Sequence, residues 1–315
     1  MTLKAYSFSE KENLSANVHD IDIRKTEKLL AVNFVEMYPC TRNSGICPLC
    51  EVEDFSFFAV INDAQYLKCE NCWSLFIPVS EDVITKYKDY EPLGDFRRSQ
   101  RYQDISKQKR TILWQEMLFW IEYRTARYGA PLKELNVAEI GGRYNGFSEM
   151  MKPFCYSYHV YDKTESIHKR YGAVLFLGHI VTEANPIKTL TAIREKLDNK
   201  GLLFLSTRVS TGFDILSLKE NVGDIFPYEA ATIPSIEALE IALEKSGFDI
   251  LEISTPGTLD MKHVIENKSK LGQNELFIRY LVEKADDSLI SEFQRFLQKN
   301  AISSHAQLVA RVNDG

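Results

Sequence analysis

Four of the six cysteines in this 315-residue chain stand in two matched pairs. Cys47 and Cys50 form the first pair, in "CPLC", and Cys69 and Cys72 form the second, in "CENC". Two residues separate the thiols in each pair, so both sulfurs can reach one metal ion, and the interval 51–68 between the pairs is typical of four-thiolate zinc sites. We predict a structural Zn²⁺ site, because four sulfur ligands leave no open position for a substrate.

The residues around these cysteines predict a small β module, a zinc ribbon over 41–80. The turn dipeptide Asn62-Asp63 separates two strand-like runs, and a third run follows. A redox-active CxxC normally occurs once, ahead of a helix, and that context is absent here. Cys40 and Cys155 stand alone, as buried or inert thiols usually do. The three predicted strands are 55–61, 64–69 and 74–79.

A second group of residues could hold a nucleotide-like ligand. The segment "EIGGRYNGF" (139–147) follows an apolar run, where a strand turns into a helix. Gly141 and Gly142 would let the backbone approach a ligand closely. Asp162 ends the next predicted strand and could accept hydrogen bonds from ribose hydroxyls. The alternative is that the glycines only make a tight turn and that Asp162 is a surface acid.

His179 is the candidate general base. It ends the predicted strand 173–180, at the sheet edge where such folds keep their sites, and its ordinary pKa suits removal of a proton from a hydroxyl. Equally, it could cap the strand or hydrogen-bond within the core. Glu183 is a weaker candidate, and His159 is expected to be structural.

A basic segment covers residues 96–110, with six basic residues against one acid. It could bind an anionic acceptor such as a nucleotide-linked sugar. The favoured interpretation is the solvated face of a linker helix, because charge runs usually have that role.

The elements that must position these residues follow an α/β pattern after residue 131. Residues 1–40 show no clear periodicity and receive no role, and 81–130 is a predicted helical linker with an apolar stripe that includes Ile112, Leu113 and Met117. Further strands and helices alternate in the region 131–315, with a helical insertion at 258–300. The further predicted strands are 135–142, 156–162, 201–209, 249–254 and 306–312, and the helices are 184–198, 235–248 and 286–300.

The composition describes a water-soluble globular chain. A formal net charge of −6 argues against nucleic acid as a partner, because phosphate binding favours a basic surface. No apolar run approaches the length of about 20 residues that spans a bilayer, so we predict no membrane contact. No signal peptide is evident, and the cytoplasm is the expected location. The sequence makes no prediction of oligomeric state.

The order of these motifs resembles the class I S-adenosylmethionine-dependent methyltransferases, in particular a bacterial subgroup with an N-terminal zinc ribbon that tailors glycans or natural products. The resemblance covers about 45–255 and includes "EIGGRYNGF", "LDNKGLLFLS" and "SIEALEIALEKSGFDI". It implies a Rossmann-like sheet with an antiparallel last strand at 306–312. It also implies S-adenosyl-L-methionine as cofactor, with Glu139, Gly141 and Gly146 beside its methionine part and Asp162 on its ribose. A small molecule or glycan precursor would be the methyl acceptor.

The chain departs from the family pattern at two places. Arg143 and Asn145 stand where the family usually has glycine. Only ten residues separate Asp162 from Ala173, too few for the usual helix and third strand, so the third strand is expected to be missing; alternatively, 173–180 is that strand. Besides a methyltransferase, a non-catalytic binding or scaffold protein therefore stays open. A nicotinamide-dependent oxidoreductase would need a GxGxxG spacing that the glycines do not supply.

Overall fold

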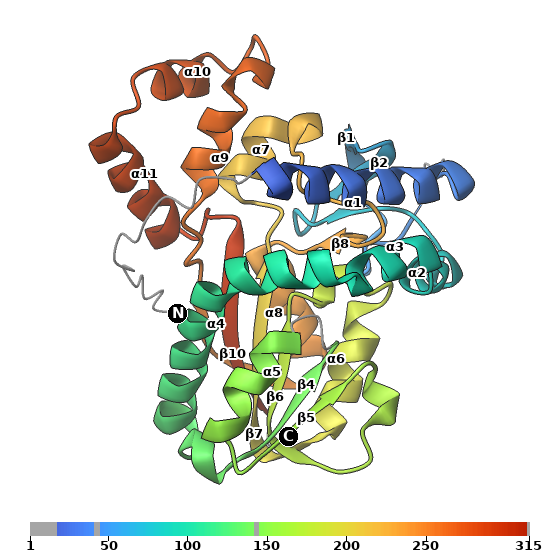
Figure 1. The fold of residues 1–315 in the computed structure, drawn as a ribbon, viewed down its shortest axis with the longest axis vertical. Helices are drawn as coiled ribbons and strands as arrows, with labels where there is room; N and C mark the ends of the chain where they lie inside the picture. The colour runs from blue at the N-terminus through green and yellow to red at the C-terminus, as the bar shows by residue number, and fades with distance from the viewer. Residues whose placement is uncertain (1–17, 41–44, 142–144, 314–315) are drawn as a thin grey trace.

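The computed structural model describes residues 18–40, 45–141 and 145–313. These residues form a large twisted sheet with helices on both faces, and a cap that covers one edge of that sheet (Figure 1).

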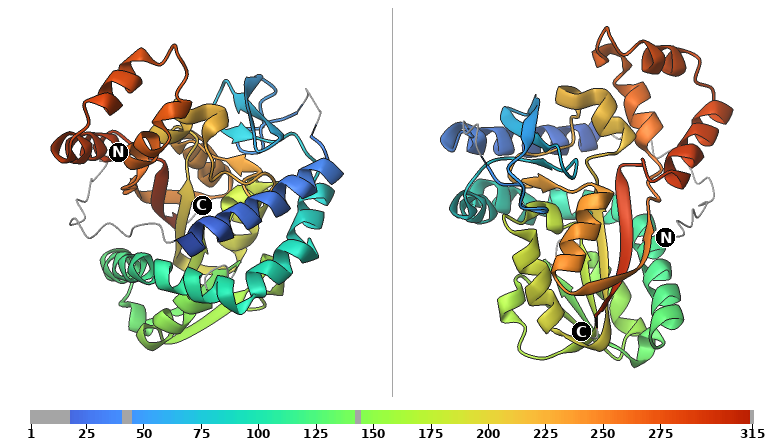
Figure 2. Two further views of the ribbon diagram at one scale, coloured as in Figure 1. Left: turned by 45° about the horizontal axis from the view of Figure 1, so that its top comes forward. Right: turned by 180° about the vertical axis from the view of Figure 1, so that it is seen from behind.

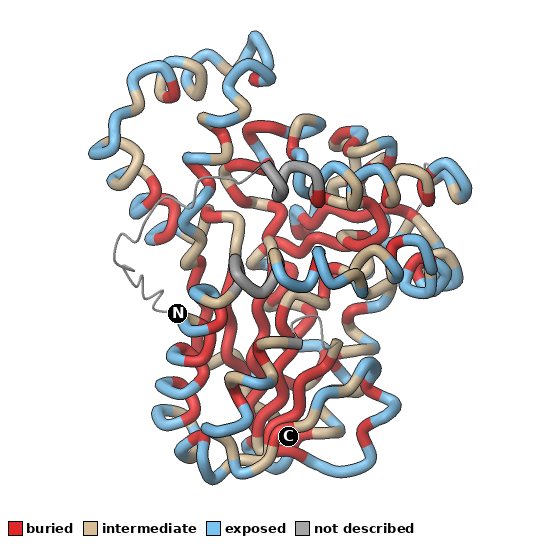
Figure 3. Tube along the Cα trace, viewed as in Figure 1, coloured by how far each residue is buried: buried red, intermediate tan, exposed pale blue. Residues whose placement is uncertain are grey.

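The large sheet has six strands in the order β5-β4-β6-β7-β10-β9. The first four run parallel, and β10 runs antiparallel to both of its neighbours. The antiparallel last strand that the resemblance implied is thus confirmed. The central strands are buried on both faces, which explains their unbroken apolar runs (Figure 3). The strands are β4 (Asn136–Ile140), β5 (Ser157–Tyr161), β6 (Tyr171–Leu177), β7 (Leu197–Arg208), β9 (Phe248–Ser254) and β10 (His305–Val312).

The strand β6 lies on the opposite side of β4 from β5. It therefore has the position of the fourth strand in the 3-2-1-4-5 order of doubly wound sheets. In the described sheet β5 is an edge strand, and the short 3₁₀ helix Thr164–Ser166 connects it to β6. A missing strand relative to a family stays a prediction, because no comparison assigns the chain to one.

Helices cover both faces of this sheet. The helices α4 (Gln100–Tyr128) and α5 (Asn145–Met151) pack on one face, and α6 (Pro186–Glu195) and α8 (Ile236–Lys245) pack on the other (Figures 1 and 2). The apolar stripe predicted for α4 is partly wrong. Ile112 and Leu113 are exposed, whereas Met117 is buried as predicted, and the buried face also contains Trp114, Leu118, Trp120 and Ile121.

The cysteine-bearing module forms a second, four-stranded sheet. Its strands are β1 (Phe55–Ile61), β2 (Ala64–Cys69), β3 (Leu75–Phe76) and β8 (Thr232–Ile233). The last of these comes from the connection between β7 and α8 and pairs antiparallel with β3. Residues more than 150 positions apart in sequence therefore complete the ribbon.

The cap surrounds this small sheet and shares one hydrophobic cluster with it, which includes Phe34, Tyr66, Tyr87, Ile215 and Met261. The N-terminal segment, for which no role was predicted, contains α1, and α1 packs in this cluster. The helices of the cap are α1 (Val18–Met37), α2 (Glu81–Lys88), α3 (Glu91–Arg98), α7 (Phe213–Leu218) and α9 (Asp260–Glu266).

The connection between β9 and β10 is helical, and after α9 of the cap the helices α10 (Leu276–Glu283) and α11 (Asp287–Lys299) form a lobe beside the cap (Figure 1). None of the described helices has the length and apolar content needed to cross a bilayer. The remaining 3₁₀ helices are Leu132–Glu134, Lys152–Phe154, Ile180–Thr182, Lys219–Asn221 and Lys268–Lys270.

A buried ion pair joins α4 to the sheet. Arg124 donates from Nε and from one terminal nitrogen to the same carboxylate oxygen of Glu252, at 3.0 Å and 2.6 Å. The hydroxyl of Tyr128 donates to the other oxygen at 3.0 Å. The ion-paired side chains are almost fully buried, so neither charge can be solvated if its partner is lost.

We expect Arg124→Met to lower the free energy of unfolding by about 3 kcal/mol, because Glu252 is left charged and buried. The double variant Arg124→Met/Glu252→Gln should recover most of this loss and keeps an acceptor for Tyr128. Urea unfolding measures both. Arg98→Met, which removes an exposed ion pair to Asp95, is the control and should change stability by less than about 1 kcal/mol. Equal losses of unfolding free energy in the single and double variants would contradict the role of this buried ion pair.

Candidate functional site

The four predicted metal ligands converge. Ligand atoms of Cys47, Cys50, Cys69 and Cys72 all lie within 4.8 Å of one another, and all four residues are buried. The sulfurs of Cys47 and Cys72 are 3.6 Å apart, and those of Cys50 and Cys69 are 3.5 Å apart. Tetrahedral zinc with Zn–S bonds near 2.3 Å places its sulfurs about 3.8 Å apart, so the residues fit such an ion.

The two cysteine turns have the same backbone form. Glu51 and Trp73, each directly after the second cysteine of a pair, both adopt left-handed conformations, with φ of 65° and 62°. Their amides donate to the carbonyl oxygens of Cys47 and Cys69, both at 2.9 Å. This turn is what points both sulfurs of a pair to the same side.

Hydrogen bonds and burial shift the pKa values of the cysteine thiols. A hydrogen bond from Cys47, assisted by Ser74 at 3.2 Å, lowers the pKa of Cys72 to about 5. The same hydrogen bond and burial raise the pKa of Cys47, and burial raises that of Cys69 to about 11. These hydrogen bonds favour the thiolate form of Cys72, which is the form that binds a metal ion, and metal binding would release the protons of the other thiols.

Gly141 and Asp162 meet at the carboxyl edge of the large sheet. Ile140 is in register with Tyr161, and the Gly141 amide donates to the Tyr161 carbonyl at 2.7 Å. Asp162 follows directly and is exposed. Gly141 has φ of +98°, which an L-residue rarely adopts. Gly142 lies outside the described residues.

His179 packs directly on this glycine turn. A Cβ built on Gly141 would overlap the imidazole ring, which also stacks on Phe176 at 6.3 Å between centroids. The ring therefore lies in the space that a glycine opens above its own Cα. The structure brings Gly141, Asp162 and His179 to one edge, as their sequence positions predicted, and their chemical roles stay predictions.

Packing explains why residue 146 is a glycine. A Cβ there would overlap the indole of Trp114, which comes from α4 and is 4% exposed. The indole nitrogen of Trp114 is buried and has no hydrogen-bond partner among the described residues. Sequence reasoning missed Trp114, since only its contact with Gly146 reveals its place beside the glycine turn.

Glu139 is turned into the protein rather than toward solvent. It is 2% exposed and accepts a hydrogen bond from the Tyr158 hydroxyl at 2.6 Å. Burial raises its pKa to about 7, although the hydrogen bond acts in the opposite direction. A group that titrates near neutrality thus lies two residues before Gly141. Of the remaining candidates, His159 stacks on Tyr161 at 6.4 Å, and Glu183 pairs with Lys88 at 2.9 Å.

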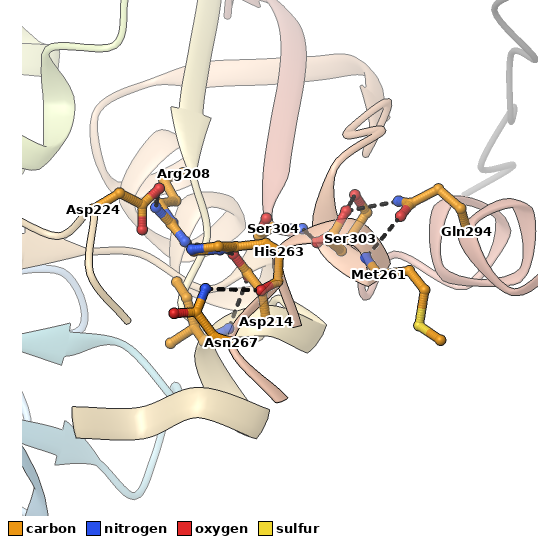
Figure 4. A network of polar contacts seen from close by, with 11 residues as sticks. Arg208, Asp214, Asp224, Met261, His263, Asn267, Gln294, Ser303 and Ser304 are labelled. Carbon is orange, nitrogen blue, oxygen red and sulfur yellow. Dashed lines mark hydrogen bonds and ion pairs between the residues drawn. The ribbon is translucent and has the colours of Figure 1, made fainter. Parts of the chain in front are cut away.

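A buried polar network that the sequence did not predict lies at the end of β7 (Figure 4). Arg208 pairs with Asp214 at 2.6 Å and with Asp224, and the His263 Nδ1 lies 3.0 Å from Asp214. The hydrogen bond to Asp214 raises the pKa of His263. Burial lowers the pKa of His305, at the start of β10, to about 4.

A second buried carboxylate anchors the same region. Asp260 accepts from Gln294 Nε2 at 2.7 Å, from Ser303 Oγ at 2.6 Å and from the Ser304 amide at 2.6 Å. These bonds hold α9 against α11 and the start of β10. The sequence carried no signal for this cluster, because its members come from three separate segments.

Comparisons with known proteins show only a distant structural similarity. No family model and no curated protein matches the chain. A solved structure of magnesium protoporphyrin IX methyltransferase from Synechocystis PCC 6803 is 12% identical, with a TM-score of 0.38, over 63% of this chain and 83% of that chain. Plantazolicin methyltransferase BamL is 8% identical, with a TM-score of 0.40, over 70% and 93%.

A solved structure of the [4+2]-cyclase SpnF is 14% identical, with a TM-score of 0.38, over 62% of this chain and 81% of that chain. TM-scores below 0.5 do not assign a function. The fold of this chain is defined by its own strand order, a Rossmann-like mixed sheet with a four-cysteine module in its N-terminal region.

We expect purified protein to contain one zinc equivalent, which Cys47→Ser/Cys69→Ser should lose. The double variant should also unfold at lower temperature, because the metal contributes folding free energy to the ribbon. Elemental analysis and thermal melting measure the two effects. Cys155→Ser is the control, since that thiol lies apart from the cluster. Full zinc content in the double variant would contradict the site.

We expect Gly141→Ala to destabilise the protein by about 2 kcal/mol, from its positive φ and from overlap with His179. In the double variant Gly141→Ala/His179→Ala the overlap is gone, so the combined loss should be smaller than the sum of the two single losses. Gly223→Ala is the control, because a Cβ there meets nothing within 4 Å. Strictly additive losses in urea unfolding would show that the ring does not pack on this turn.

Proposed function

We propose that this protein is an S-adenosylmethionine-dependent methyltransferase, with its cofactor site at the glycine turn after β4. The supporting observation is the meeting of Gly141, Asp162 and His179 at the carboxyl edge of a parallel sheet, where open α/β sheets bind their ligands. The antiparallel β10 between β7 and β9 agrees with the family resemblance.

Different residues at this edge would contact different parts of the cofactor. Asp162 is exposed beside the turn, so its carboxylate is accessible to accept hydrogen bonds from two ribose hydroxyls. Gly141 lets the backbone of the turn lie close to the His179 ring, Gly146 does the same for the buried Trp114, and Glu139 is buried two residues before Gly141. When bound, S-adenosylmethionine would supply an electrophilic methyl group.

We propose His179 as the residue that accepts a proton. Methyl transfer is an in-line displacement, and much of its acceleration comes from alignment of the acceptor atom. A neutral imidazole beside the glycine turn could accept the proton of an acceptor hydroxyl or amine as that atom becomes a better nucleophile. We propose a small molecule or a glycan precursor as acceptor.

The four-cysteine module has a structural role in this proposal. Four sulfurs complete the coordination of a zinc ion, so no position is left for substrate. Its contribution is to hold the cap over the carboxyl edge.

A non-catalytic binding protein is the second candidate. The contacts of His179 with Gly141 and of Trp114 with Gly146 favour it, because side chains of the protein itself use the space that the glycines open. The two candidates differ in whether a cofactor binds.

We expect calorimetric titration with S-adenosylhomocysteine to show binding below millimolar concentration, and Asp162→Asn to weaken it about tenfold through loss of a charged acceptor. Asp198→Asn is the control, because that exposed residue lies near the start of β7, at the opposite edge of the sheet. Absence of binding at millimolar concentration by folded wild-type protein would favour the non-catalytic candidate.

A further inference from the structure

A pocket separate from the glycine turn opens beside α4. Its volume is 260 Å³, and it lies between α4, the end of β9, the start of β10 and α11. The strand β10 is three positions from β4 in the sheet, which corresponds to about 14 Å. None of the described residues of the glycine turn lines it. It is thus a second place where a small ligand could bind.

A half-buried carboxylate lines this pocket. Arg124 also lines it, but its guanidinium is already paired with Glu252. The carboxylate belongs to Glu116, and no ion pair or hydrogen bond of it is found in the described part of the chain. Burial raises the pKa of Glu116. A cation bound beside it would stabilise the charged carboxylate, so this wall favours a ligand with a positive charge.

The walls are aromatic. Phe119, Trp120 and Tyr123 line the pocket within two turns of α4, next to Glu116 on the same helix. Trp120 is buried against Phe204, whereas Phe119 and Tyr123 are 67% and 58% exposed. The guanidinium of Arg124 already lies over the Tyr123 ring, 4.8 Å from its centroid. Phe119 therefore offers the exposed aromatic face for an organic cation, and Tyr123 adds apolar contact area.

The opposite wall is mostly apolar. It includes Gln298, Gln307 and Ser254, all nearly buried, and the Gln298 amide nitrogen already donates to the Gly257 carbonyl oxygen at 2.9 Å. The cavity is somewhat smaller than the range of about 300–1,000 Å³ for drug-sized ligands. Its ligand should therefore be small, with an apolar body and one charged group.

We propose that this pocket binds a small organic cation, an amine or quaternary ammonium compound whose charged group pairs with Glu116 and whose apolar body lies against Phe119 and Tyr123. The proposal is independent of methyl transfer. It rests on the cavity, the unpaired acid and the aromatic wall, all of which lie outside the glycine turn.

The test uses 2-phenylethylamine and its neutral counterpart 2-phenylethanol as probes, with calorimetric titration of the full chain. We expect the amine to bind at least tenfold more tightly than the alcohol. Glu116→Gln should abolish this difference, and Phe119→Ala should weaken both probes. Glu122→Gln, an exposed acid on the same helix outside the pocket, is the matched control and should bind like wild type.

Three outcomes would overturn the proposal. They are equal affinity of the two probes for wild type, unchanged amine affinity in folded Glu116→Gln, and displacement of the amine by S-adenosylhomocysteine, which would place it at the glycine turn. Circular dichroism of each variant establishes that it is folded. S-adenosylhomocysteine is also titrated alone. If it does not bind but the amine does, the methyltransferase proposal is rejected and the proposal for this pocket is retained.

Discussion

The helix α8 connects the two cysteine turns to the large sheet, and the position of the whole cap depends on it. At its first end the Ser235 hydroxyl accepts from the Ala238 amide at 2.9 Å and donates to the Cys72 carbonyl. At its last turn Lys245 donates to the Cys50 carbonyl at 3.1 Å. Because one rigid helix contacts both turns, the four sulfurs are held in a fixed place relative to the sheet that α8 covers.

This attachment explains why the ribbon is not an independent module. Its cysteines belong to the same hydrophobic cluster as α6, α8 and one face of the sheet, and β8 extends its sheet from the other side. A metal ion in the four-sulfur cluster would therefore stabilise the contact between cap and sheet as well as the ribbon itself. The polar network around Asp214 and Asp260 joins α7 and α9 of the cap to the ends of β7 and β10 in the same way.

The long helix α4 links the two candidate ligand sites. Trp114 packs against Gly146 of the glycine turn, and Glu116, Phe119, Trp120, Tyr123 and Arg124 line the pocket near β10. The ion pair of Arg124 with Glu252 fixes the pocket end of the helix to β9. One helix thus contributes side chains to the surroundings of both sites.

Local spacing was enough to predict the cysteine cluster, the strand–turn–helix at Gly141 and a last strand at 306–312, whereas the antiparallel direction of that strand was implied only by the family resemblance. Each of these depends on residues close in sequence, or on a pattern of apolar residues with a fixed period. The packing of His179 on Gly141, the contact of Trp114 with Gly146 and the pairing of β8 with β3 join residues 32 to 158 positions apart. Such contacts are selected by the fit of whole surfaces, which no local pattern encodes, so only the tertiary structure showed that side chains of this protein fill the space its glycines open.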